Sequence, residues 1–137
     1  MADATMTLQV EDPLTAALPW VRFLSLQGSG NGITFNSLET PERFSVTQLG
    51  VFDLIFNAAT GVSFPEAPSI SSTAPPASNA VVLSSFGSSS FTLTVTVTNQ
   101  TPRQTVSFTI NTTGGPIDPS IAIDPPGGVD GDPKEPR

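Results

Sequence analysis

The sequence predicts an all-β protein: an immunoglobulin-like β-sandwich of about seven short strands, with an extended Pro/Gly-rich C-terminal tail. Apolar and polar residues alternate with period two over much of the chain, as expected for strands with one buried face. The 137 residues include 14 Pro and 11 Gly, which break helices and favour turns. This length corresponds to a single domain, and nine Phe and one Trp supply bulky core side chains.

The expected strands follow one another at short intervals. Met6, Leu8 and Val10 alternate with polar residues near the N-terminus. The clearest pair is 91–98 and 106–110, whose alternation across a turn at 99–102 predicts an antiparallel hairpin. Weaker strands are expected at 20–26, 33–36, 44–48, 51–56 and 80–86. A small β-barrel is the alternative architecture.

One helical turn is expected at 14–18, where Asp12 would cap it and Pro19 would stop it. The chain then divides into three segments. Residues 1–111 are the expected sandwich core, and 112–125 carry an Asp-Pro signature and are a candidate edge strand. Residues 126–137 form an acidic Pro/Gly tail.

The composition excludes several functions. The chain has no Cys and no His, which excludes thiol nucleophiles, disulfides, zinc-ribbon sites and a Ser-His-Asp triad. Its net charge of −7, without a basic stripe, argues against nucleic-acid binding. No apolar run is long enough for a membrane span, and no signal peptide is visible, so a cytoplasmic location is expected. No cofactor or metal is expected.

A short motif opens the tail. Asp118-Pro119 is followed by Ile121 and then by Asp124-Pro125. This skeleton resembles the C-terminal signature of the bacterial DP-EP family, in which an Asp-Pro step precedes an isoleucine and a Glu-Pro step. Asp124 stands where that family has Glu. The resemblance implies a Greek-key β-sandwich and a candidate aspartic-type peptidase activity, with self-cleavage at the Asp-Pro step.

The chemistry of such a step can be stated from the residues themselves. The Asp118 carboxyl lies within reach of its own carbonyl carbon, and the Pro119 nitrogen, a tertiary amide, leaves more readily than an ordinary amide nitrogen. A buried carboxylic acid could supply the proton. Asp118 is therefore the candidate nucleophile, and the candidate helper acids are Asp124, Asp53 and Glu39. Asp53 interrupts the apolar segment 51–56, where an ionised carboxylate is costly unless paired.

Each of these features also has a simpler, structural interpretation. Pro119 could protect an edge strand from pairing with other chains. Asp53 could lie on a solvated sheet face or pair with Arg22 or Arg43. The acidic residues of the tail resemble a loose calcium cluster but lack the spacing of an EF-hand, so a solvated acidic tail is favoured; they are Asp124, Asp130, Asp132 and Glu135.

The alternative to self-cleavage is a non-catalytic structural or binding module. Its C-terminal tail would dock on the sheet edge of a neighbouring subunit, so self-association through the tail is the expected partner interaction. A lectin-like or calcium-binding sandwich has little support, because Trp20 is the single Trp and no Tyr is present to form a sugar platform.

Overall fold

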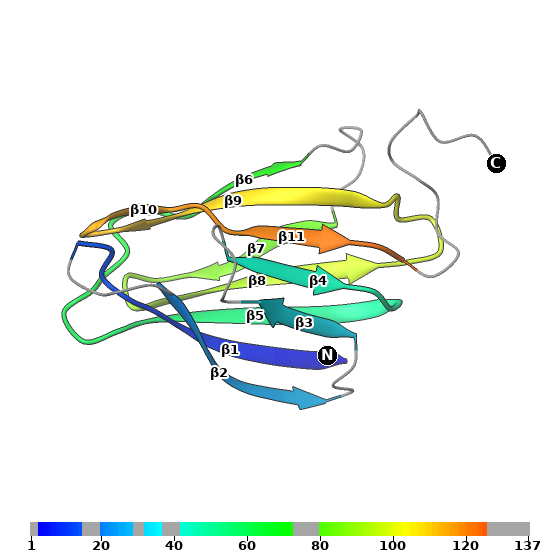
Figure 1. The fold of residues 1–137 in the computed structure, drawn as a ribbon, viewed down its shortest axis with the longest axis horizontal. Helices are drawn as coiled ribbons and strands as arrows, with labels where there is room; N and C mark the ends of the chain where they lie inside the picture. Colours follow the sequence, from blue (N-terminus) through cyan, green and yellow to red (C-terminus); the bar gives the residue numbers. More distant parts are fainter. Residues whose placement is uncertain (1–2, 15–19, 29–31, 37–41, 73–79, 126–137) are drawn as a thin grey trace.

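The computed structural model describes residues 3–14, 20–28, 32–36, 42–72 and 80–125, and the regular structure in these ranges consists of strands without a helix (Figure 1). The all-β prediction is confirmed. The expected helical turn at 14–18 lies almost entirely outside the described residues, and none of the described segments is a helix long and apolar enough to cross a membrane.

Eleven strands are present in the described ranges, where the sequence predicted about seven. Several of the additional strands have only three or four residues, too few for an alternation pattern to stand out. The strands are β1 (Ala4–Val10), β2 (Val21–Gly28), β3 (Ile33–Asn36), β4 (Arg43–Val46), β5 (Gly50–Ala58), β6 (Ser69–Ser72), β7 (Val81–Phe86), β8 (Ser90–Val97), β9 (Gln104–Thr112), β10 (Gly115–Ile117) and β11 (Ser120–Ile123).

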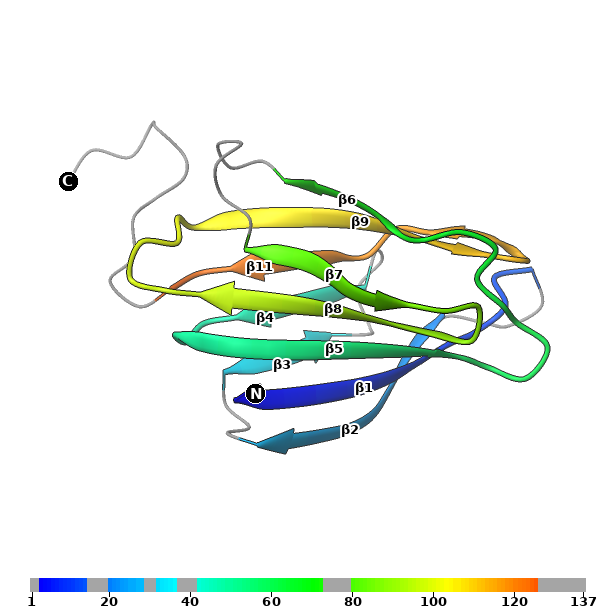
Figure 2. The same ribbon diagram turned by 180° about the vertical axis from the view of Figure 1, so that it is seen from behind.

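These strands form two mixed sheets that lie face to face. The first has the order β2-β1-β5-β8-β7, and the second has the order β10-β9-β11-β4-β3, with β6 also paired to β9. Figure 2 shows the first sheet as one layer and the second as the layer behind it. Each sheet contains one parallel pair, β1 with β5 in the first and β4 with β11 in the second. The molecule is therefore a two-layer β structure whose chain crosses between the layers.

Where apolar and polar residues alternate strictly in the sequence, the strand has one buried and one solvated face. On β8, Phe91, Leu93 and Val95 are buried, whereas the intervening threonines are partly solvated. The predicted hairpin residues 91–98 and 106–110 both form strands, but β8 and β9 belong to different sheets. The turn between them is therefore a connection from one layer to the other, a distinction that alternation alone does not make.

A cluster of phenylalanines joins the two layers. The Phe56 ring stacks on Phe91 at a centroid distance of 4.8 Å and meets Phe108 edge-on at 5.7 Å. Phe44 meets the Phe56 ring edge-on at 5.9 Å. Since Phe44 and Phe108 come from the second sheet and Phe56 and Phe91 from the first, these contacts tie the layers together.

The open edges of both sheets are short or irregular. β2 and β7, the outer strands of the first sheet, each pair with their neighbour through a register shift of the β-bulge kind. β3 and β6, at the edges of the second sheet, have four residues each. Bulges and short edge strands discourage pairing with other chains.

Phe56→Ala should lower the free energy of unfolding by about 3–5 kcal/mol, because it removes the ring that joins the phenylalanines of both layers. Ile55→Thr is the matched control, since Ile55 faces outward on the same strand, and its effect should be below about 1 kcal/mol. Urea unfolding followed by circular dichroism measures both. Equal losses in the two variants would contradict the assigned orientation of β5.

Candidate active site at the Asp118-Pro119 step

Asp118 and Pro119 lie between β10 and β11, opposite β9. Ile117 pairs with Ile110 on one side of the step, and Ser120 pairs with Ser107 on the other. The sum of the paired residue numbers is the same on both sides, so the antiparallel register continues through the step without a shift. Asp118 therefore lies opposite Thr109, and Pro119 lies opposite Phe108.

Proline explains why the strand is interrupted there. The Phe108 N–H donates to the Pro119 carbonyl at 3.1 Å. A hydrogen-bonded antiparallel pair normally exchanges two such bonds, but Pro119 has no N–H to donate in return. The interruption between β10 and β11 is therefore a missing hydrogen bond within one continuous extended segment.

The side chains of the step alternate like those of any strand. Pro119 is buried and Asp118 is exposed on the outer face of the second sheet. The Thr109 hydroxyl, directly across on β9, donates to Asp118 Oδ1 at 2.7 Å. The carboxyl expected to be the nucleophile is thus hydrogen-bonded across to β9.

Glu42 approaches the step from the other side. β11 pairs in parallel with β4, with Ser120 opposite Arg43, so the same register places Glu42 beside Pro119. The Ser120 N–H donates to the Glu42 carbonyl at 3.1 Å, which fixes this neighbourhood. Glu42 and Pro119 therefore lie side by side on adjacent chain segments, and both residues are buried.

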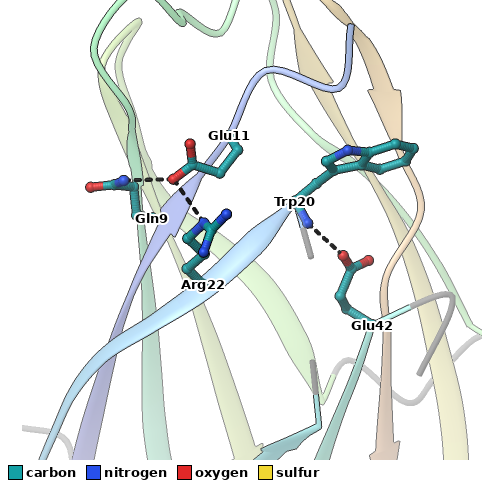
Figure 3. Close-up of polar contacts among 5 residues, drawn as sticks. All are labelled: Gln9, Glu11, Trp20, Arg22 and Glu42. Carbon is teal, nitrogen blue, oxygen red and sulfur yellow. Dashed lines mark hydrogen bonds and ion pairs between the residues drawn. The ribbon is translucent and has the colours of Figure 1, made fainter. Parts of the chain in front are cut away.

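The Glu42 side chain points into the protein. It is 3% exposed, and it is the one carboxylate among the buried polar residues of the described segments. Its Oε2 accepts the backbone N–H of Trp20 at 3.0 Å (Figure 3). A buried carboxyl needs such partners. Glu42 therefore connects the start of β2, in the first sheet, to the start of β11, in the second.

A second carboxylate nearby already has a cationic partner. Glu11 Oε2 accepts the Gln9 side-chain amide at 2.6 Å and lies 3.3 Å from Arg22 Nε (Figure 3). Glu11 comes directly after β1, and its side chain is 17% exposed. Arg22 is thus directed toward Glu11, just beyond the end of the neighbouring strand β1.

The structure does not place Asp124 near the step. Asp124 follows β11 on the same face as Asp118, six residues further along one continuous register, and six residues of strand span about 20 Å. Its carboxylate lies 4.0 Å from Arg103, in a solvated pair. Asp118 and Asp124 therefore cannot share a proton.

The remaining sequence candidates lie elsewhere. Asp53 is on β5 in the first sheet, where its Oδ1 accepts the Thr94 hydroxyl at 2.8 Å. It faces outward, as the solvated-face interpretation of the sequence expects, with Thr5 and Thr94 as its strand neighbours. Glu39 lies outside the described residues, as do three acidic residues of the tail, Asp130, Asp132 and Glu135.

Sequence reasoning missed Glu42 because its environment is not local. Its chain neighbours Pro41 and Arg43 are typical of a solvated turn, and its burial depends on parallel pairing with residues about eighty positions later. No local pattern signals such pairing. The one available hint is the even-numbered alternation Glu42, Phe44, Val46, which assigns Glu42 to the face of two apolar residues.

No protein-family model matches the chain, and no curated protein sequence matches it.

Glu42→Ala should lower the free energy of unfolding by about 1–3 kcal/mol, because it leaves the Trp20 N–H without this acceptor in a partly buried position. Glu42→Gln retains an oxygen acceptor and should lose less. Urea unfolding monitored by Trp20 fluorescence gives both values without interference, since the chain has one Trp and no Tyr. The exposed Glu66→Ala is the control; a Glu42→Ala protein no less stable than this control would contradict the assigned contact.

Proposed function

We propose that this protein cleaves its own chain at the Asp118-Pro119 bond. The observation that carries the proposal is the 2.7 Å hydrogen bond from the Thr109 hydroxyl to Asp118 Oδ1, which restrains the side chain of the proposed nucleophile at the bond to be cut. Holding an intramolecular nucleophile in attack geometry can lower a barrier by up to about 7–11 kcal/mol. The absence of Cys and His leaves carboxyl groups as the natural nucleophile and acid.

The reaction proceeds in two steps. A carboxylate oxygen of Asp118 bonds to the Asp118 carbonyl carbon, the bond from that carbon to the Pro119 nitrogen breaks, and a proton is delivered to the departing nitrogen. The product is a cyclic anhydride on Asp118 and a free Pro119 amine. Water then adds to the anhydride and restores two carboxyl groups on Asp118, one of them the new C-terminus.

Pairing within the second sheet would hold the two cleavage products together. Residues 120–123 are hydrogen-bonded to β9 on one side and to β4 on the other, and Ile121 and Ile123 are buried. A cut before Pro119 would therefore leave the two pieces associated. The measurement has to be made under denaturing conditions.

The bond can be identified by mass alone, because the chain contains four Asp-Pro steps: Asp12-Pro13, Asp118-Pro119, Asp124-Pro125 and Asp132-Pro133. After incubation of the folded protein between about pH 4 and pH 8, denaturing mass spectrometry should show fragments 1–118 and 119–137. Ordinary acid hydrolysis would instead cut at several of the steps. An intact chain throughout, or cleavage without preference for Asp118, would contradict the proposal.

Two substitutions should abolish the cut. Asp118→Asn removes the carboxylate nucleophile, and Pro119→Ala replaces the tertiary amide with an ordinary one. Asp124→Asn is the matched control, since it removes a carboxylate just beyond the end of β11, about 20 Å away. It should cleave like the unsubstituted protein, and cleavage that persists in Asp118→Asn would contradict the role of the Asp118 carboxyl.

The motif also supports a finer assignment of the fold. Asp118-Pro119, Ile121 and Asp124-Pro125 have the spacing of the DP-EP signature, and we assign the chain to that family and its sandwich to the immunoglobulin-like Greek-key kind. The alternation of this segment, with Pro119, Ile121 and Pro125 buried, supports a role for the signature in the fold as well.

A second function, a non-catalytic assembly module, is favoured by one observation: the step lies in an unshifted register with β9, as in an ordinary strand. The tail beyond Pro125 would then dock on a neighbouring subunit. Because β11 belongs to the core, the informative truncation removes residues 126–137 only. This candidate predicts that the chain stays whole and that light scattering finds oligomers that the truncation dissociates; a monomer with the tail intact would contradict it.

A further inference from the structure

We propose that Glu42 is the acid that protonates the Pro119 nitrogen as the Asp118-Pro119 bond breaks. The inference rests on the proposed self-cleavage and assigns the proton donor that this reaction requires. It replaces the helper acids expected from the sequence, Asp124 and Asp53, which the fold places far along the strand and on the other sheet.

The position of Glu42 fits a donor to this nitrogen. In a strand, the peptide plane lies close to the plane of the sheet. The nitrogen lone pair of a planar amide lies perpendicular to the peptide plane, and once resonance with the carbonyl is lost it can accept a proton from one face of the sheet. Pro119 and Glu42 are neighbours across β11 and β4, and their buried side chains both lie on the inner face. An acid on that face can reach the inward lobe of the lone pair.

The proton balance closes with these two carboxyl groups. In the proposed step Asp118 acts as the nucleophile and Glu42 as the general acid. Glu42 gives its proton to the Pro119 nitrogen and becomes a carboxylate, which the Trp20 N–H stabilises at 3.0 Å. Water that opens the anhydride supplies one proton that returns to Glu42.

The cationic groups on the neighbouring elements pair elsewhere or lie on the other face of the sheet. Arg22, on the β2 side, is paired with Glu11. Arg43 follows Glu42 in the chain and is exposed, so it lies on the opposite face, as Asp118 does on the neighbouring segment. The proposed step therefore depends on Asp118 as the nucleophile and on Glu42 as the proton donor, so the loss of either group should slow cleavage.

The test compares cleavage rates of the full-length chain by denaturing mass spectrometry over a pH series. Glu42→Gln has nearly the same shape and keeps an acceptor for the Trp20 N–H, but it has no carboxylic proton. Its cleavage rate should fall by about 10²–10⁴-fold. Asp124→Asn, which removes one carboxylate just beyond β11, should retain the rate.

Trp20 emission like that of the unsubstituted chain, together with a cooperative urea transition, would show that Glu42→Gln is folded and that the rate effect is not a loss of folding. If Glu42→Gln does not fold, Glu42→Asp replaces it: this variant keeps a carboxylic acid and should still cleave, at a reduced rate. An unsubstituted chain that cleaves at the same rate as Glu42→Gln would overturn the role of Glu42 and leave the proposed function standing. A chain that never cleaves would overturn both.

Discussion

The structure depends most on the pairing of one short segment, residues 120–123, with two strands at once. β11 lies between β9, to which it is antiparallel, and β4, to which it is parallel (Figure 1). Without it, the second sheet would separate into a hairpin, β3 with β4, and a group of strands around β9. Ile121 and Ile123 add apolar contacts to these backbone hydrogen bonds, and both are buried. Four residues near the C-terminus thus complete a layer that begins near residue 33.

The same pairing creates the candidate active site. Because β11 keeps its register with β9 through the step, Asp118 meets Thr109 and Pro119 meets Phe108. Because β11 pairs in parallel with β4, Glu42 lies beside Pro119 on the neighbouring segment. A single-residue slip on either side would exchange the buried and solvated faces. The signature residues therefore have a structural role whether or not the bond is cut, since Pro119 and Pro125 fill buried positions at the two ends of β11.

The sequence predicted what depends on local pattern and missed what depends on long-range pairing. Alternation in 91–98 and 106–110 identified two strands correctly, because each buries one face along its length. It could not show that these strands belong to different sheets, nor that residues 120–123 would lie between two others. The prediction of Asp118 and Pro119 rests on chemistry within two adjacent residues. Glu42 was not predicted as a site residue, because its burial is a property of the assembled sheet. Asp53 was predicted as a candidate, because the sequence of an apolar strand does not distinguish an outward position from an inward one.

The central claim is that the fold directs cleavage to one Asp-Pro bond. The most direct measurement compares the folded chain with the same chain unfolded in urea, at the same pH and temperature, by denaturing mass spectrometry. We expect the folded sample to accumulate fragments 1–118 and 119–137 and the unfolded sample to show no preference among its four Asp-Pro bonds. Equal patterns in the two samples, or a folded chain that stays whole, would contradict the account.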